Sequence, residues 1–167
     1  EIINLFSKSL TDVKTKIKRC SICNNLSEED KCQICKDKDR NNKLICVVEE
    51  PKNVILFEKL NIFDGYYHVL DGLISPIDGI NPEDINISSL INRVKKDKIA
   101  ELILALKPSV EGETTSLYIS KLLEKEDVKI TKIAYGIPMG AEMDYVDSLT
   151  LELALENRMD ITTNKNS

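Results

Sequence analysis

Four cysteines within sixteen residues constrain this chain more than any other feature of its sequence. They form two C-x-x-C pairs, Cys20 with Cys23 and Cys32 with Cys35. Each pair forms a tight knuckle whose two sulfurs converge, so two knuckles joined by a short hairpin supply four soft ligands for a tetrahedral Zn²⁺. Because all four ligands come from the protein, the pattern predicts one structural zinc ion per chain with no open coordination position.

Other uses of the cysteines fit the sequence less well. Two adjacent disulfides would close loops too short to constrain much of the chain. A thioredoxin-type redox site needs one C-x-x-C after a strand of a βαβ unit, not two in a polar stretch. A fifth cysteine, Cys46, lies in the apolar run 44–48 and is predicted to be a small core residue.

Charge is distributed unevenly along the 167 residues, whose net charge is −5. Residues 1–46 hold ten Lys or Arg against seven Asp or Glu, and the remainder holds 13 against 21. An acidic whole argues against a broad nucleic-acid surface, but the basic first part allows a local one. The length allows one substantial core with a small satellite domain, and no apolar run approaches the roughly 18 residues that span a membrane.

Residues 2–17 have the apolar spacing of a helix. Apolar residues recur every three or four positions, at Ile2, Ile3, Phe6, Leu10, Val13 and Ile17. The chain opens inside this pattern without a Met, so we expect a preceding segment in the natural protein. Basic residues lie near the two knuckles and are candidate DNA contacts: Lys14, Lys16, Lys18, Arg19 and Arg40. A solvated basic face is the alternative interpretation.

After the cysteines, apolar strands alternate with helices. Strands are expected at 44–49, 66–70, 100–106 and 129–135, and helices at 51–60, 88–96, 114–126 and 145–158. Ser88 is expected to cap the second of these helices, 71–82 is expected to be an irregular loop, and the tail 160–167 is expected to be disordered. The order predicts an α/β fold in which helices cover both faces of a four-stranded parallel sheet.

Acidic residues follow two of the predicted strands. Glu49 closes the first strand, and Glu111 and Glu113 come after the third. Because the carboxyl ends of parallel strands share one edge of a sheet, we expect these side chains there, where hard metals bind in many phosphoryl-transfer enzymes. A role in satisfying amides of loops and helix N-termini stays open.

This arrangement resembles a Toprim domain, the metal-binding module of topoisomerases, primases and related nucleases. Val47-Val48-Glu49 closes a first strand, and Glu111-Gly112-Glu113 follows a later one. Further stretches narrow the resemblance, over residues 1 to about 158, to the RecR family of bacterial recombination mediators. They are the four-cysteine knuckle and residues 67–70, 74–80, 108–113 and 133–140, in RecR-like order and spacing.

The resemblance implies a DNA-repair protein without catalysis of its own, in the bacterial cytoplasm and at the nucleoid during repair. RecR-like chains assemble into dimers or ring-shaped tetramers, and with RecO or RecF they help load the RecA recombinase at single-stranded gaps. The family's DNA-contacting helix-hairpin-helix is mostly absent from these residues. The implied domains are a helix at 1–19, a four-cysteine zinc finger at 20–43, a Toprim domain at 44–136 and a C-terminal segment at 137–167.

One departure from catalytic Toprim domains bears on mechanism. Those domains pair a glutamate after the first strand with Asp-x-Asp after a later strand, and the carboxylates serve Mg²⁺ chemistry. Glu49 matches, but Glu111 and Glu113 stand in place of the two aspartates and are longer by one methylene each. Since misplacement by about 1 Å costs on the order of a hundredfold in rate, we expect no catalytic residue here. Weak Mg²⁺ binding by these glutamates and hydrogen bonding to a partner both stay open.

Rival functions are a Mg²⁺-dependent Toprim nuclease or topoisomerase and a module that binds only proteins. The remaining candidate residues favour neither. His68, the one histidine, is predicted to be structural. Gly136-x3-Gly140 lacks the Gly-Lys-Ser/Thr of a P-loop. Tyr145 beside Asp144 is either a nucleophile or the start of a helix.

Overall fold

The computed structural model describes residues 1–159 and divides the chain into two compact units, Glu1–Lys132 and a second that begins at Ile133. The first unit opens with α1 (Ile2–Lys16) and a small finger built from β1 (Lys18–Arg19), β2 (Leu26–Ser27) and α2 (Gln33–Lys36). An α/β core follows: β3 (Asn41–Val48), α3 (Pro51–Leu60), β4 (Gly65–Val69), η1 (Pro82–Asp84), α4 (Ile87–Asp97), β5 (Glu101–Ala105), α5 (Val110–Leu122) and β6 (Lys129–Lys132).

The predicted parallel sheet is confirmed. Its four strands lie in the order β4-β3-β5-β6, and every neighbouring pair is parallel. At the centre of the sheet, Val47 of β3 is in register with His68 of β4 and Leu104 of β5. The chain moves outward to β4 and then crosses to β5 on the other side of β3, so β3 and β5 flank the point where strand order reverses, the usual position of sites in such sheets.

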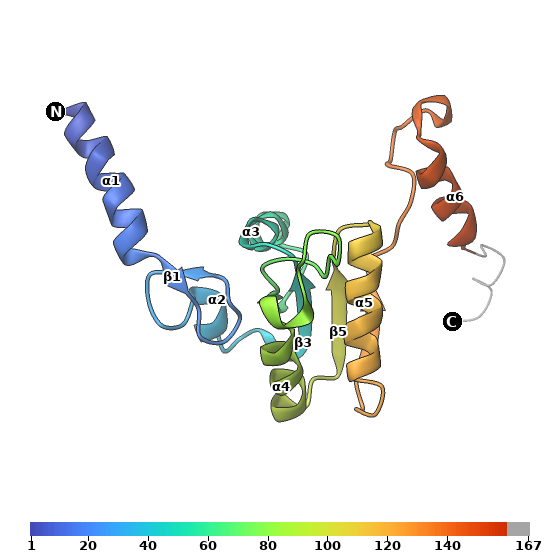
Figure 1. Ribbon diagram of the computed structural model, residues 1–167, viewed down its shortest axis with the longest axis horizontal. Helices are drawn as coiled ribbons and strands as arrows, with labels where there is room; N and C mark the ends of the chain where they lie inside the picture. Colours follow the sequence, from blue (N-terminus) through green and yellow to red (C-terminus); the bar gives the residue numbers. More distant parts are fainter. Residues whose placement is uncertain (160–167) are drawn as a thin grey trace. The chain divides into compact units, whose positions relative to one another are not determined.

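Helices cover both faces of the sheet, as the strand pattern predicted (Figure 1). Ile45 and Val47 of β3 belong to a core that includes residues of α4 and α5. Cys46 and Val48 alternate with them and pack with Val54 of α3. Because successive strand residues face opposite sides, residues 45–48 of β3 are buried on both faces of the sheet, which explains the apolar sequence of this part of the strand.

Several predicted boundaries were wrong. The second core helix begins at Ile87 with Asn86 at its N-cap, so Ser88 lies in its first turn; burial of Ile87 draws the helix start earlier. The third runs over Val110–Leu122, not 114–126, because Ser109 is an effective N-cap whose hydroxyl accepts from the Gly112 amide at 3.2 Å. The last strand ends at Lys132 instead of residue 135.

The second unit contains η2 (Met143–Tyr145) and α6 (Ser148–Glu156). The predicted helix at 145–158 therefore begins three residues later, where the Asp147 carboxylate caps the Thr150 amide at 2.9 Å. The predicted disordered tail, 160–167, lies outside the described residues. Within residues 1–159, no helix is long and apolar enough to cross a membrane.

The predicted helix at 2–17 is α1, and its apolar stripe lies in the open. No residue of α1 is buried among residues 1–159. Phe6 and Leu10 keep 65% and 57% of their surface exposed. The periodicity therefore identified the helix correctly but not a packing partner for it.

Candidate functional site

The sulfurs of Cys20, Cys23, Cys32 and Cys35 gather at one point in the finger. All four lie within 4.8 Å of one another, and the Sγ atoms of Cys23 and Cys32 are 3.6 Å apart. Four thiolates around a tetrahedral zinc with bonds of about 2.3 Å would be separated by about 3.8 Å. The observed spacing therefore fits one zinc ion without rearrangement.

Backbone geometry explains why the sulfurs converge. After the first pair, Asn24 takes a left-handed conformation (φ 61°), which asparagine tolerates, and its amide donates to the Cys20 carbonyl at 3.0 Å. In the second pair, Cys32 caps α2 and its Sγ accepts from the Cys35 amide at 3.4 Å. The Cys32 amide donates to the Cys20 Sγ at 3.3 Å. Such amide donors stabilise thiolates.

Electrostatics also call for a cation at this point. The hydrogen bond shared with Cys32 raises the pKa of Cys23 to about 12, while the bonds from Cys23 and Cys35 lower the pKa of Cys32 to about 2. Hydrogen bonds with Cys23 and Cys32 raise the pKa of Cys35. The cluster thus resists holding four negative charges unless a dication neutralises them. Cys20, Cys23 and Cys32 are at most 5% exposed, so the site is closed and structural.

Cys46 takes no part in this cluster. It is 3% exposed within β3, and burial raises the pKa of its thiol to about 12. The thiol is therefore protonated and shielded, which agrees with the predicted core role.

The acidic residues lie at the predicted end of the sheet. Glu49 directly follows β3, and Glu111 and Glu113 lie in the first turn of α5, which begins soon after the neighbouring strand β5. Hydrogen bonds from its own amide and from the Ser109 hydroxyl hold the pKa of Glu111 below its ordinary value. The Glu113 carboxylate forms an ion pair with Lys132 at 3.1 Å.

The three glutamates do not assemble into a metal-binding group. Within residues 1–159, the four cysteines are the single set of three or more Cys, His, Asp or Glu side chains close enough to share an ion.

Two acids from the loop after β4, Asp71 and Asp78, lie near this edge and were not predicted from the sequence. Asp78 lies near enough to oppose the lowered pKa of Glu111, and the Asp71 amide donates to the Glu49 carbonyl at 2.9 Å.

A close backbone approach explains the glycine between the two glutamates of α5. A Cβ atom added to Gly112 would lie 1.9 Å from the Lys107 carbonyl oxygen. The turn that brings Glu111 and Glu113 to the sheet edge thus requires a residue without a side chain.

The predicted DNA-binding residues differ in how free their charges are. The side chains of Lys14 and Lys18 are exposed and make no hydrogen bond or ion pair with other residues in 1–159. Lys16 pairs with Asp12 of the same helix at 2.9 Å, and Arg19 pairs with Asp71 at 2.8 Å. The two free lysines sit on either side of the junction between α1 and β1.

Arg40 is bound within the fold. Its side chain is 16% exposed, forms an ion pair with Glu58 and another with Asp37 at 3.5 Å, and donates to the Gly65 carbonyl at 2.9 Å. Because these contacts occupy its guanidinium, Arg40 is less available to a phosphate group than the exposed lysines are.

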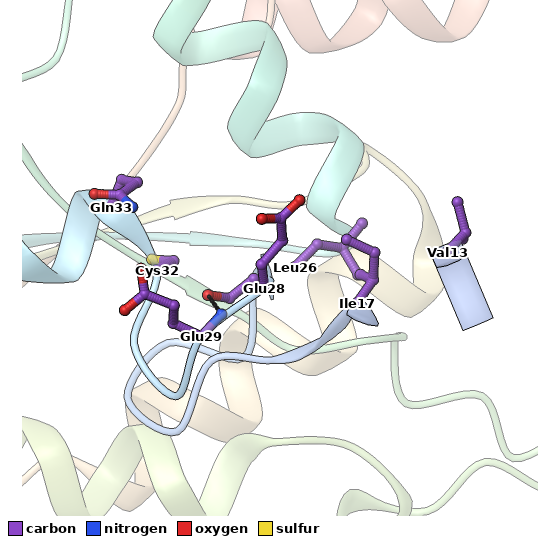
Figure 2. Close-up of a pocket in the computed structure, with 8 residues that line it drawn as sticks. Val13, Ile17, Leu26, Glu28, Glu29, Cys32 and Gln33 are labelled. Carbon is purple, nitrogen blue, oxygen red and sulfur yellow. Dashed lines mark hydrogen bonds between the residues drawn. The ribbon is translucent and has the colours of Figure 1, made fainter. Parts of the chain in front are cut away.

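A hollow of about 530 Å³, which the sequence did not indicate, lies beside the finger (Figure 2). Val13, Ile17 and Leu26 give it apolar walls, and Glu28 and Glu29 add acidic side chains. The apolar stripe of α1 thus continues to the zinc-binding segment.

Three further residues were candidates from the sequence: His68, Gly140 and Tyr145. His68 is completely buried, and its Nε2 lies 3.0 Å from the Asn86 carbonyl oxygen. Gly140 has φ 82° in a turn, and Tyr145 ends η2 with 86% of its surface exposed.

Comparison with known proteins identifies the family. Three family models match in order: the RecR four-cysteine zinc finger domain at residues 17–37, the Toprim domain at 43–134 and the RecR C-terminal region at 136–159. The recombination proteins RecR of Staphylococcus aureus strains JH9 and Newman are each 49% identical over 156 residues, covering 93% of this chain and 79% of theirs. The chain belongs to the RecR family.

The RecR family match confirms the resemblance that the motifs indicated. The zinc finger model covers all four cysteines, so the RecR assignment and the sulfur geometry agree on one zinc per chain. The Toprim match covers the four strands of the parallel sheet except the first two residues of β3, and Glu49, Glu111 and Glu113 lie inside it. A role in recombinational DNA repair follows from family membership.

Proposed function

We propose that this chain is a non-catalytic, DNA-binding subunit of a homo-oligomeric clamp, a dimer or a tetrameric ring. In this proposal it acts with RecO or RecF to promote loading of RecA at single-stranded gaps. Family membership supports a recombination-repair role. The finer proposal rests on how the acidic edge and the basic residues are placed.

The partners and the placement of Glu49, Glu111 and Glu113 are the main support for the proposal. The Glu113 carboxylate pairs with Lys132, and Glu111 is stabilised as a carboxylate by the N-terminal turn of α5. Glu49, Glu111 and Glu113 lie at one end of the sheet but do not converge as ligands of one ion. Carboxylates that do not converge on one point suit ion pairs with basic side chains of a protein partner better than two-metal phosphoryl chemistry.

The DNA contact is assigned to Lys14, Lys18 and the neighbouring Lys16. Their positive charges are exposed at the junction between α1 and β1, within an otherwise acidic chain. Phosphate contacts by a few lysines give weak, salt-sensitive binding without base preference. The dissociation constant of such binding is roughly 10⁻⁴ to 10⁻⁶ M. A clamp that presents several copies would gain affinity by avidity.

Fluorescence anisotropy with labelled single-stranded DNA tests the DNA contact. A Lys14→Glu/Lys18→Glu variant should bind about tenfold more weakly and show a shallower salt dependence, because it loses two phosphate contacts. Lys121→Glu/Lys125→Glu is the matched control, since it makes the same change of charge at the far end of α5. Equal affinities for the two variants would contradict the assignment.

Capture of immobilised RecO tests the acidic edge. Charge reversal in Glu49→Lys/Glu111→Lys should weaken capture at least tenfold while the circular dichroism spectrum stays unchanged. Glu124→Lys, in the exposed segment after α5, serves as the control. Capture of the edge variant at the level of the control would rule out this surface as the docking site.

A further inference from the structure

The outer side of β4 is closed by groups from outside the sheet. This strand is at the edge of the sheet, where unpaired backbone groups would invite pairing with other chains. Arginines cover two of its carbonyls: Arg40 donates to Gly65 at 2.9 Å, and Arg93 donates to Tyr67 at 2.7 Å. The next alternate residue, Val69, is covered in a different way.

The first zinc knuckle covers Val69. The Val69 amide donates to the Cys23 carbonyl at 2.8 Å, and its carbonyl accepts from the Asn24 side-chain amide at 3.1 Å. Cys23 is a zinc ligand, and Asn24 owes its left-handed conformation to the turn of the knuckle. The geometry that gathers the sulfurs therefore also places both groups against the strand.

A second contact of the finger reaches the acidic edge. Two residues beyond Val69, Asp71 accepts the ion pair from Arg19 at 2.8 Å. The Asp71 amide donates to the Glu49 carbonyl at 2.9 Å. A short path of hydrogen bonds thus joins the knuckle to the backbone of Glu49.

We propose that zinc binding locks the end of β4 and, through Val69 and Asp71, the backbone that carries Glu49. We call this contact the seal: Cys23 and Asn24 of the first knuckle cover the backbone of Val69 when zinc is bound and release it when zinc is lost. Loss of zinc frees Val69 and loosens Asp71, while the interior of the core stays folded. Since coupling between two sites is reciprocal, a change at Asp71 also alters how tightly the finger holds zinc.

Amide hydrogen exchange followed by NMR, with and without a chelator, tests the seal. In the zinc-free protein the Val69 amide should exchange at least tenfold faster. Two nearby amides are internal controls, because Leu70 bonds the Val48 carbonyl inside the sheet and Ile74 bonds the Thr115 hydroxyl of α5. Unchanged protection of Val69 would overturn the proposal, and so would equal loss at all three amides, which indicates global unfolding.

The rate of zinc release to a chromogenic chelator tests the reverse direction. Asp71→Asn keeps a residue that tolerates the positive φ of 68° but removes the charge that pairs with Arg19. Because both side chains of this pair are partly exposed, release should be about two- to fivefold faster. Asp78→Asn is the control, since Asp78 bonds Ser75 in the same loop. Release from Asp71→Asn at the control rate would contradict the coupling.

A consequence for partner docking rests on the proposed function. If RecO docks on Glu49 and Glu111, chelation of zinc should reduce its capture several-fold. Faster exchange of Val69 with undiminished capture would leave the seal standing and remove the docking assignment. Reduced capture with Val69 still protected would remove the seal and leave the docking assignment.

Discussion

Gly112 shows how one residue shapes the acidic edge. The Lys107 carbonyl oxygen occupies the space where a Cβ atom would lie. Gly112→Ala should therefore lower the free energy of unfolding by about 2 kcal/mol or more, since the backbone must shift to avoid the contact. Urea unfolding followed by circular dichroism measures the change.

Gly136→Ala is the matched control for Gly112→Ala. A Cβ atom at Gly136 has nothing within 4 Å, and this residue lies outside any helix or strand. Its unfolding free energy should change by less than about 0.5 kcal/mol. Equal stability of the two variants would contradict the close approach at Gly112.

His68 makes stability depend on pH. Burial lowers the pKa of its imidazole from an ordinary 6.5 to about 4. Between these values the unfolded chain binds a proton that the folded chain excludes, so stability is lost as pH falls from about 6.5 towards 4. Between pH 7 and pH 5 the loss amounts to about 2 kcal/mol.

A His68→Gln variant isolates this contribution, because glutamine offers a donor to the Asn86 carbonyl but does not titrate in this range. Urea midpoints at pH 7 and pH 5 should separate less for His68→Gln than for the natural sequence. Both proteins carry the same zinc site, so any loss of metal at pH 5 affects them equally. Parallel pH dependence in the two proteins would refute the assignment to His68.

At the scale of elements, the finger and the sheet differ in what holds them together. The finger has a small apolar cluster of three buried cysteines with Ile22, Ile34 and Cys35 at its margin, whereas the sheet has an extensive core on each face. Removing zinc should unfold residues 18–40 and leave the α/β core intact. Elemental analysis should find one zinc per chain, and chelation should expose four titratable thiols.

Chelation should also leave most of the helical and strand signal in the circular dichroism spectrum. Cys46 is the internal reference, because its buried thiol should react only after denaturant is added. Purified protein without zinc, or a core that melts together with the finger, would contradict this division of the chain.

For the whole molecule, the placement of the acids predicts catalytic silence. Neither supercoiled nor single-stranded DNA should be cut when Mg²⁺ or Mn²⁺ is supplied, because Glu113 is paired with Lys132 and the three glutamates do not converge on one ion. Gel assays with a metal-dependent nuclease as positive control measure this. Reproducible cleavage that disappears in Glu49→Gln would favour the rival Toprim nuclease.

Interactions over short sequence distances were predictable from the sequence. The four zinc ligands follow from knuckle spacing, which is local geometry. The strand and helix order follows from apolar periodicity, and it required parallel strands whose ends bring Glu49 and α5 to one edge. Helix starts were less accurate because caps such as Ser109 compete with neighbouring polar residues.

Tertiary structure alone decided the long-range pairings. Arg40 lies 18 residues from Glu58, and Arg19 lies 52 residues from Asp71, so no periodicity links either pair. The closing of β4 by the zinc knuckle depends on which strand forms the edge of the sheet, and strand order is set by packing of the whole chain. A sequence pattern states which groups need partners, whereas the fold determines which partners come within reach.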